Sequence, residues 1–493
     1  MEGSLARARA ALASRDFRFV LSARLVSQFA DGVFQAYLVD RIVFLSTDTK
    51  GTAVGVAVAL ALLVIPYSAV GPFVGVFVDR WSRRRILLVT PLVRAAVALP
   101  LLAQHGGATW PTYVLALVVV SLDRFYLTTA GAVMPAVVPA EDLLVGNAMA
   151  GALGTVTTFL GLFAGSQVAA ATGASVLAGV TAGLLGASGA LAAGIGRPLR
   201  TNLPPVRLLA EVRRIAVDFA AGARRLVATP PAFGGIVTVT LDQILFGIVT
   251  VLSIVVFRHR FHGGVASYGR IIGVGGVGLV LGTFAVGALE SRGLSKPRIV
   301  ALAFALGGLA CAAAAPALAP PSVLAVSFLL GLAYPWKKIP VDTVTQQAVP
   351  DRFRGRVFAV YDLGASMARV VGAVIAAALL PHLSVPAILE GIGLCYLAWT
   401  AVVPAWLARP VRARVRFYAG GRAEETPRAI VVGGEEEPVA VVRSWTEQAA
   451  GVMRRRFRVR GLESELDLVE DPAGGRWLVR EAQRGTPIRP GGQ

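Results

Sequence analysis

The sequence predicts an all-α membrane protein with twelve transmembrane helices in two six-helix halves, followed by a cytoplasmic C-terminal tail. Three observations lead to this fold class. The 493 residues are 55% hydrophobic and only 16% charged, whereas soluble domains carry about 25% charged residues. Twelve apolar stretches are each near the roughly 20 residues that a spanning helix needs. Eight of the ten deepest charges lie in stretches 1, 4, 7 and 10, which indicates a three-helix unit used four times around a polar cavity.

The apolar stretches follow one another so closely that no soluble core fits between them before Arg409. A charge at the centre of a spanning helix costs about 2.5–3.5 kcal/mol, so the charges inside these stretches should face water, a partner or a ligand. The first stretch is too long and too polar for a signal peptide, and we expect it to be retained. The predicted spans are 18–39, 52–77, 86–104, 109–131, 147–170, 172–196, 231–257, 264–289, 298–317, 320–346, 357–381 and 385–408.

Basic residues give the chain a formal net charge of +19, and their positions predict the topology. They gather at alternate junctions between spans, among them 80–85, 197–225 and 409–416. Cytoplasmic loops of membrane proteins are enriched in Lys and Arg. We therefore expect a multi-pass protein of the plasma (inner) membrane, with both termini cytoplasmic and membrane lipids around it, and no nucleic-acid partner.

Four parts follow one another along the chain. Residues 1–196 form the N-terminal six-helix half, and residues 231–409 form the C-terminal six-helix half. Residues 197–230 are a cytoplasmic linker that either lies along the inner leaflet or simply tethers the halves. Residues 410–493 are a cytoplasmic tail of mixed charge, for which a small β-containing domain and a disordered regulatory tail are both open.

The loop between spans 2 and 3 carries the most specific motif. Gly71-Pro-Phe-Val-Gly75-Val-Phe-Val-Asp79-Arg80-Trp-Ser82-Arg83-Arg84-Arg85 resembles the loop signature of the major facilitator superfamily (MFS), with Ser82 where the family usually has glycine. Residues 134–147 and 351–362 resemble two further loops of its bacterial members. The resemblance covers about residues 15–408, and it implies the MFS fold of two pseudo-symmetric halves.

The resemblance also implies a conformational latch on the cytoplasmic side. Asp79 is an anion suited to a helix N-terminus, where the macrodipole is positive, and in the family that helix is span 11. Arg83 is then expected to pair with Asp123 at the inner end of span 4. The alternative is a basic flank with an incidental acid. A copy at 287–296 is degenerate, which makes a second latch doubtful. The matching residues are Gly75, Asp79, Arg80, Arg83 and Arg84.

In the superfamily, spans 1, 4, 7 and 10 line a central pathway, which agrees with the charge pattern. Span 1 has one polar stripe, because its four polar residues fall within roughly 60° of one another on a helix. Asp31 and Asp242 are the best proton-site candidates, because burial shifts the pKa of a carboxyl group into a range that suits proton binding and release. The cations are expected to contact the substrate or reset the carboxylates. The candidate pathway residues are Arg24, Gln28, Asp31, Gln35, Arg124, Asp242, Gln243, Lys337, Lys338 and Asp342.

Span 10 combines charges with helix breakers. Pro335 and Pro340 bracket two lysines and predict a broken helix at membrane depth, which is tolerated where it lines a cavity. Lys338 and Asp342 are four residues apart and form an ion pair if the helix resumes. The alternative is that such charges neutralise one another and only clamp the bundle.

Other deep charges fit the pattern less well. Asp31 has Arg24 seven residues away on the same helix face, and the alternative to a proton site is that these two charges neutralise each other. Arg94 and Arg369 lie on spans 3 and 11, which should not line the cavity. We expect Arg94 to pair near the cytoplasmic end, and the sequence assigns no role to Arg369.

Catalytic and cofactor chemistry are not expected. The cysteines fall inside spans, and His259 and His262 share a short basic loop, so neither pair predicts a metal site. The glycines of 273–278 fit a dinucleotide fingerprint, but they lie within span 8 and are better explained by close helix packing, as are Gly161 and Gly165. No cofactor and no enzymatic activity are therefore predicted.

The leading hypothesis is a secondary active transporter that moves a small organic solute by alternating access. Protons are the expected coupling ion and export the expected direction, and the protein is expected to work as a monomer. One alternative is an organic-anion uptake transporter, which the cationic residues favour. Another is a membrane-anchored sensor that signals through its cytoplasmic tail.

Overall fold

A computed structural model describes most of the chain. In the helical part it describes residues 9–44, 49–78, 81–104, 106–139, 142–196 and 208–409, and in the tail residues 411–418, 426–432, 435–449, 452–460, 465–470 and 477–481.

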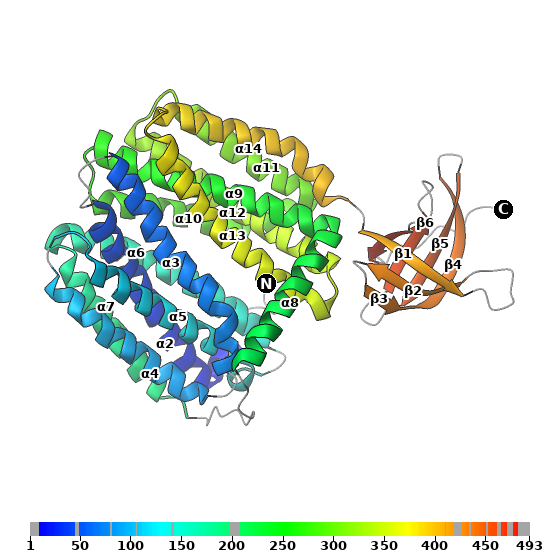
Figure 1. Cartoon of the computed structure of the whole chain (residues 1–493), viewed down its shortest axis with the longest axis horizontal. Helices are drawn as coiled ribbons and strands as arrows, with labels where there is room; N and C mark the ends of the chain where they lie inside the picture. The colour runs from blue at the N-terminus through cyan, green and yellow to red at the C-terminus, as the bar shows by residue number, and fades with distance from the viewer. Residues whose placement is uncertain are drawn as a thin grey trace.

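Long helices make up both predicted halves (Figure 1). The N-terminal half contains α2 (Arg15–Val39), α3 (Thr49–Val78), α4 (Arg83–Ala98), α5 (Trp110–Val137), α6 (Leu143–Thr172) and α7 (Ser175–Ala193). The linker contains α8 (Leu208–Ala228). The C-terminal half contains α9 (Pro230–Val255), α10 (Val265–Ser291), α11 (Lys296–Ala314), α12 (Pro320–Ala348), α13 (Asp351–Leu379) and α14 (Val385–Leu407).

Local sequence explains where many of these helices begin. The Ser14 hydroxyl accepts a hydrogen bond from the Phe17 amide at the start of α2, and Ser384 caps α14 in the same way. Proline stands in the first turn of α5, α9, α11, α12 and α14, where its missing amide costs no helical hydrogen bond. The number of consecutive apolar residues that follow each of these starts then determines how long the helix is.

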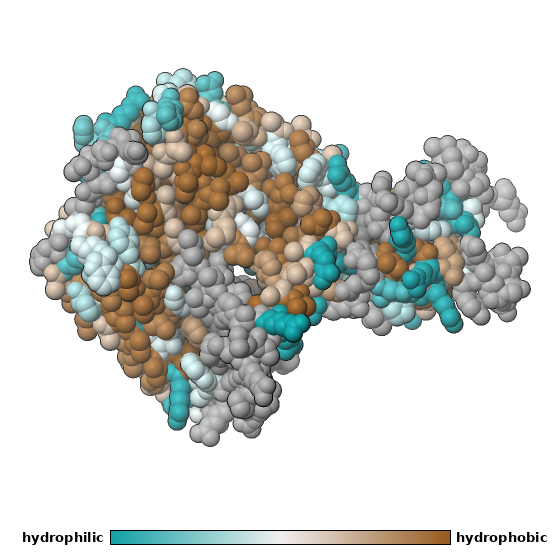
Figure 2. Space-filling view, viewed as in Figure 1, coloured by the Kyte–Doolittle hydropathy of each residue, from teal (hydrophilic) through white to brown (hydrophobic). Residues whose placement is uncertain are grey.

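Nine helices of the described part are long and apolar enough to cross a membrane. They include every helix of the two halves except α2, α3 and α12. Helices α2 and α12 each carry several of the charges that the sequence singles out, and in α3 only Gly51–Val64 is found as a shorter apolar helix. Figure 2 shows apolar residues over much of the visible helical surface, with hydrophilic residues toward its edges. The protein is thus a multi-pass membrane protein, and a twelve-span topology stays a prediction.

Glycines let the first and fifth helices of the N-terminal half cross at close range. A Cβ on Gly32 of α2 would run into the carbonyl oxygen of Thr158, and one on Gly161 of α6 would run into that of Phe29. The two backbones therefore touch directly, as small residues allow between membrane helices. Close packing at Gly161, predicted from the sequence, is confirmed.

The C-terminal half repeats this crossing between α9 and α13. A Cβ on Gly247 would run into the carbonyl oxygen of Arg369, and one on Gly372 would run into that of Ile244. In both halves each glycine lies three residues beyond the residue whose carbonyl meets the other glycine. The two halves are thus built around the same helix crossing.

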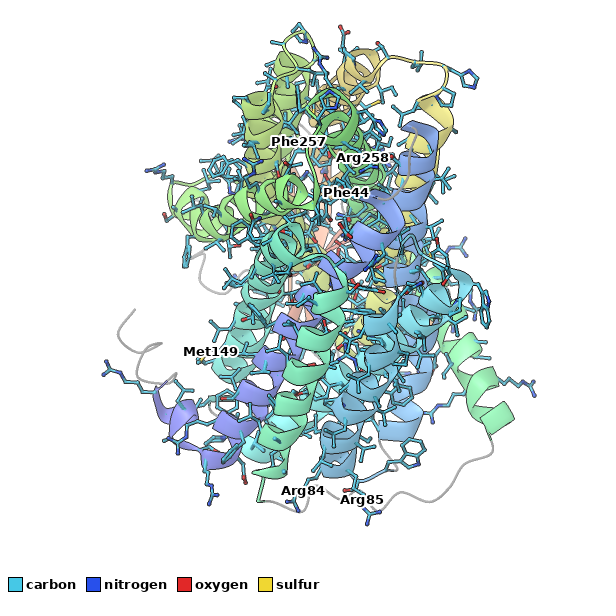
Figure 3. All side chains as sticks on the ribbon, turned by 90° about the vertical axis from the view of Figure 1, so that its left-hand side faces the viewer. Phe44, Arg84, Arg85, Met149, Phe257 and Arg258 are labelled. Carbon is cyan, nitrogen blue, oxygen red and sulfur yellow. The ribbon has the colours of Figure 1, made fainter. Side chains whose placement is uncertain are left out.

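Two of the contacts between the halves lie toward the ends of the helices opposite Arg84 and Arg85 (Figure 3). The Gln167 side chain of α6 donates a 3.2 Å hydrogen bond to the Ala266 carbonyl of α10. The Arg258 guanidinium lies 5.6 Å from the ring centroid of Phe44. Both residues lie in π-helical turns, Asp40–Phe44 after α2 and Val256–Arg260 after α9. These contacts join the halves on the side predicted to face outward.

The linker helix α8 packs against the beginning of α13. Asp218 forms a 3.1 Å ion pair with Arg356, and the Arg225 guanidinium lies 5.5 Å from the ring centroid of Phe353. The linker therefore does more than tether the halves, because it contacts the C-terminal half directly. An orientation along the inner leaflet stays a prediction.

After Arg409 the described residues form a seven-stranded antiparallel sheet, beyond the end of α14 in Figure 1. The Val439 amide donates a 2.8 Å hydrogen bond to the Arg428 carbonyl, which links the turn between β3 and β4 to β2. Ile430, Phe457 and Leu468 are buried in its core with Trp477. The strands are β1 (Val411–Tyr418), β2 (Thr426–Val432), β3 (Glu435–Pro438), β4 (Ala440–Ala449), β5 (Val452–Arg460), β6 (Glu465–Glu470) and β7 (Trp477–Glu481).

Candidate functional site

A buried arginine of α4 gathers two carboxyl groups in the N-terminal half. The Arg94 guanidinium is 1% exposed and forms ion pairs with Asp31 of α2 and with Asp123 of α5, the latter at 3.1 Å. It also donates to the Ser27 hydroxyl and to the Val119 carbonyl, each at 3.1 Å. We call Asp31, Arg94 and Asp123 the N-half cluster. The guanidinium thus donates to two oxygens on α2 and to two on α5.

The N-half cluster changes two expectations. Asp31 is paired with Arg94, whereas Arg24 donates to Gln28 at 3.1 Å. The expected pair of Arg83 with Asp123 is wrong, because Arg83 donates to the Ala132 carbonyl at 3.0 Å. Ala132 lies nine residues beyond Asp123, about 13.5 Å along the helix. Distance along α5 therefore separates the arginine of the loop from the acid.

A second buried ion pair lies in the C-terminal half. Lys337 of α12 binds Asp242 of α9, and the two side chains are 3% and 4% exposed. The Tyr396 hydroxyl of α14 donates to the same carboxyl at 3.1 Å. The Lys337 ammonium also lies 4.9 Å from the Tyr396 ring centroid and 5.2 Å from that of Phe304, where aromatic faces attract a cation. We call Asp242, Lys337 and Tyr396 the C-half cluster.

Arg369, which had no assigned role, binds the other polar side chain of α9. Its guanidinium donates to the Gln243 side-chain oxygen at 2.9 and 2.6 Å and lies 5.5 Å from the Phe246 ring centroid. Gln243 is buried, with 2% of its surface exposed. The neighbouring polar residues of α9 thus face two different helices, α12 and α13.

A less buried group of charges lies beside the C-half cluster. Lys338 and Asp342 form the ion pair expected from their spacing, at 2.8 and 2.7 Å, and are 26% and 25% exposed. Lys338 lies 4.6 Å from the Tyr361 ring centroid. The charges of Lys338 and Arg124 both act on the carboxyl group of Asp362 in α13. Arg124 belongs to α5, so charges from both halves influence this carboxyl group.

The expected break in span 10 is wrong. Helix α12 runs without interruption from Pro320 to Ala348, with Pro335 and Pro340 inside it. Each proline removes one helical donor, and neighbouring helices commonly compensate for such losses in membranes. The Trp336 indole, which donates to the Gly282 carbonyl at 3.0 Å, fastens this part of α12 to α10. The lysines therefore project from a continuous helix.

The other predicted residues lie on α2 and in the predicted latch. Gln35 is half-buried on α2. In the latch, Arg84 donates to the Ala193 carbonyl at 3.1 Å, and Gly75 lies in α3. Asp79 and Arg80 are outside the described residues, so the latch stays a prediction.

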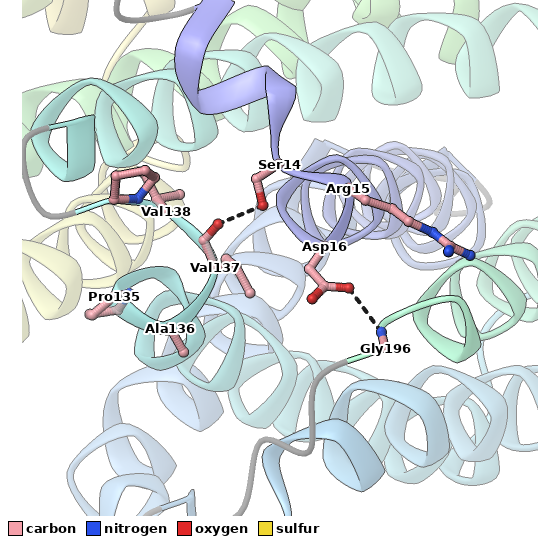
Figure 4. Close-up of a pocket in the computed structure, with 9 residues that line it drawn as sticks. Ser14, Arg15, Asp16, Pro135, Ala136, Val137, Val138 and Gly196 are labelled. Carbon is pink, nitrogen blue, oxygen red and sulfur yellow. Dashed lines mark hydrogen bonds between the residues drawn. The ribbon is translucent and has the colours of Figure 1, made fainter.

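A cavity of about 580 Å³ lies at the end of the N-terminal half, away from the predicted pathway. It is lined by the start of α2, by residues 135–139 at the end of α5, and by Gly196 (Figure 4). Ser14 donates to the Val137 carbonyl at 2.8 Å, and Asp16 accepts from the Gly196 amide at 2.9 Å. These bonds join the ends of three helices, and we assign the cavity no role in transport.

Sequence reasoning missed Arg94, Tyr396 and Arg369 as site residues. The one signal available for the arginines was their depth inside apolar spans, because a buried charge implies a partner. No group of three or more His, Cys, Asp or Glu residues that could hold a metal ion occurs in the described part of the chain.

Comparisons with known proteins identify the family. The model of the Major Facilitator Superfamily matches residues 20–361. An uncharacterized MFS-type transporter of Mycobacterium tuberculosis is 32% identical over 391 residues, which cover 74% of this chain and 85% of that protein. Macrolide efflux protein A of Streptococcus pyogenes is 30% identical over 114 residues, covering 22% of this chain and 28% of that protein.

Solved transporter structures share the fold. A crystal structure of a mutant peptide transporter POT has a TM-score of 0.61 at 14% identity, covering 81% of this chain and 97% of that one. The POT family transporter PepTSo has a TM-score of 0.61 at 12% identity, with 80% and 98% coverage. The chain therefore belongs to the Major Facilitator Superfamily, and it is a transport protein rather than an enzyme.

Proposed function

We propose that this protein is a secondary active transporter that exports a small organic solute by alternating access, coupled to protons. The observation that carries the proposal is a buried charged cluster in each half, with the less buried pair of Lys338 and Asp342 beside the cluster of the C-terminal half. Buried charges are expensive in a membrane and mark ion and substrate pathways. The short match to a macrolide efflux protein favours export of an organic compound.

The same proposal includes the finer topology. Twelve spans place both termini and the sheet of residues 411–481 in the cytoplasm, beneath the plasma membrane. The contacts of Phe44 with Arg258 and of Gln167 with Ala266 then close the outer side. Rocking of the halves must break these contacts in order to open that side.

Charge pairing favours a neutral or weakly polar solute over an organic anion. Lys337 and Lys338, two of the candidate cations of the pathway, are each paired with a carboxylate. An anion that bound to either lysine would have to displace Asp242 or Asp342 first. Uptake of an organic anion is therefore the weaker alternative.

The test is a panel of solutes on reconstituted vesicles, with and without an imposed pH gradient. We expect an uncharged or weakly basic solute to accumulate against its gradient when protons can flow the other way. Transport of organic anions alone would support the uptake alternative. Deleting residues 410–493 should leave flux intact, and loss of all function on deletion, without loss of insertion, would favour a sensor.

A further inference from the structure

The strand β4 of the tail sheet has one edge that no described strand covers. The strands run in the order β3-β2-β1-β7-β6-β5-β4, so β4 pairs with β5 on one side and ends the sheet on the other. Directly before β4, the Val439 amide is bound to the Arg428 carbonyl of β2, and beyond this bond the described part of the chain gives β4 no second neighbour. In Figure 1, β4 lies on the side of the sheet turned away from the helices. Its outer amides and carbonyls can therefore pair with another strand.

The part of β4 that is open to pairing is regular. Side chains on both faces of its first half are exposed, and those of Val441 and Val442 are 36% and 47% exposed. A bulge can protect an edge strand by bending it. In β4 the register with β5 shifts between Val441 and Arg443, and it is then continuous to Ala449. The stretch from Arg443 to Ala449 is thus an unprotected edge.

Arg443 lies in unfavourable surroundings while this edge stays open. The side chain is exposed, and it forms no ion pair within the described part of the chain. Its direct neighbour on β5 is Arg458, which is itself paired with Asp467 at 2.8 Å. Like charges that lie directly opposite each other in a sheet are destabilising. An acid supplied by a strand on the open side would relieve this repulsion.

The strand itself carries the acid that suits Arg443. Glu447 is 44% exposed and follows Arg443 on the same face of β4, with Trp445 midway between them. If two copies of β4 pair in antiparallel fashion about Trp445, residues equally far from this centre face each other, so Arg443 of each copy meets Glu447 of the other. Glu447 already contacts Arg456 of its own chain, and a carboxylate accepts from two guanidinium groups. The edge of β4 is therefore complementary in charge to itself.

We propose that β4 is a dimerisation strand. Two copies of this chain pair their β4 edges in antiparallel fashion, with Trp445 on the two-fold axis and Arg443 of each chain against Glu447 of the other. The backbone ladder joins the two sheets, and the symmetry makes every side-chain contact away from the axis twice. Each chain keeps its own N-half and C-half clusters, so the expected monomer remains the transport unit and the dimer is its assembly.

Charge reversal in the full-length protein tests the pairing. Arg443→Glu places a carboxylate opposite Glu447, and Glu447→Arg places a guanidinium opposite Arg443, so each variant alone should dimerise at least about tenfold more weakly than wild type. An equal mixture of the two variants restores both ion pairs, and dimers should return. Arg414→Glu is the matched control, because it reverses an exposed arginine of β1, away from β4. Single-molecule photobleaching of labelled protein in lipid vesicles counts the dimers.

Disulfide cross-linking tests the register independently of charge. It uses chains with Cys395→Ala, because Cys395 is exposed whereas Cys311 is buried. Trp445→Cys should form a covalent dimer under mild oxidation, since its two copies meet at the axis. Arg443→Cys alone should not, because its copies lie about 14 Å apart along the strands, beyond the reach of a disulfide. A mixture of Arg443→Cys and Glu447→Cys chains should cross-link one variant to the other.

Three results would overturn the proposed dimer. The first is a wild-type protein that stays monomeric in vesicles. The second is dimerisation of Arg443→Glu at the wild-type level, or no return of dimers when the two charge variants are mixed. The third is cross-linking of Arg443→Cys as readily as Trp445→Cys, which indicates random collision. Recovery on mixing also excludes unfolding of the tail as the cause of the loss, because an unfolded strand presents no edge to its partner.

Discussion

The two halves of the protein share a helix crossing but not their charges. Aligning Gly32 of α2 with Gly247 of α9 brings the same glycine-to-carbonyl contacts into register. The alignment places Ser27 opposite Asp242 and Asp31 opposite Phe246, one helical turn away. The backbone crossing is thus repeated, whereas the ionisable residues occupy different turns.

This difference separates what packing requires from what chemistry requires. Close contact of two backbones leaves no room for a Cβ, so both halves need glycine at the same places. An ion pair needs only that its partners meet, and they meet here from different helices: the cation comes from α4 in one half and from α12 in the other. The two halves therefore place their ion pairs differently on the same helix crossing.

Removing the cation of the C-half cluster should have the largest effect. Lys337→Met leaves Asp242 buried without its ion pair, which should cost about 3–5 kcal/mol of unfolding free energy. Unfolding in detergent, followed by denaturant, measures it. Lys338→Met is the matched control in a partly exposed pair and should cost less than about 1 kcal/mol. Asp242→Asn combined with Lys337→Met should recover most of the loss, and failure to recover would mean that packing, not charge, holds these helices.

The shared crossing should respond equally in both halves. Gly161→Ala and Gly372→Ala each force a Cβ against a backbone carbonyl, and overpacking of this kind costs about 1–3 kcal/mol. Gly151→Ala on the same helix α6 is the control, because a Cβ there meets nothing within 4 Å. Thermal unfolding measures the three variants, and a marked inequality between Gly161→Ala and Gly372→Ala would break the symmetry of the crossing.

The loop signature around Asp79 and its degenerate copy around Glu290 allow the two halves to be compared by solute flux. Asp79→Ala should lower solute flux several-fold without affecting membrane insertion, because a carboxylate at a helix N-terminus contributes about 0.3–1 kcal/mol to one conformation. Glu290→Ala, in the degenerate copy of the second half, should leave flux unchanged. Equal effects of both changes would indicate two working latches, and no effect of either would remove the latch.

The smallest effect concerns the tail. A hydrogen bond from Arg455 lowers the pKa of Glu470 from its usual 4.5. The folded value then lies below the unfolded one, so the pair stabilises the sheet above the unfolded pKa and loses this effect as the pH falls through the folded pKa. Glu470→Gln should cost at most about 1 kcal/mol at neutral pH. Hydrogen exchange of β5 and β6 measures it, and the difference from wild type should vanish in acid.

Local features were predictable. Helices lie over the predicted spans because apolar length is a property of continuous sequence, and Lys338 meets Asp342 because a helix brings residues four apart together. The partners of Asp31, Asp242 and Gln243 were not predictable, since they lie 63, 95 and 126 residues away in the sequence. Two prolines also failed to break α12, because its neighbours hold it in place.

By itself, the sequence determined that this chain lives in a membrane, which family it resembles, and which helices carry charge. Those properties follow from composition, from the length of apolar stretches and from short motifs, all of which are features of consecutive residues. Only the tertiary structure decided which charged side chains pair with one another. Pairing depends on distances between helices that are remote in sequence, and such distances exist only after the halves have packed.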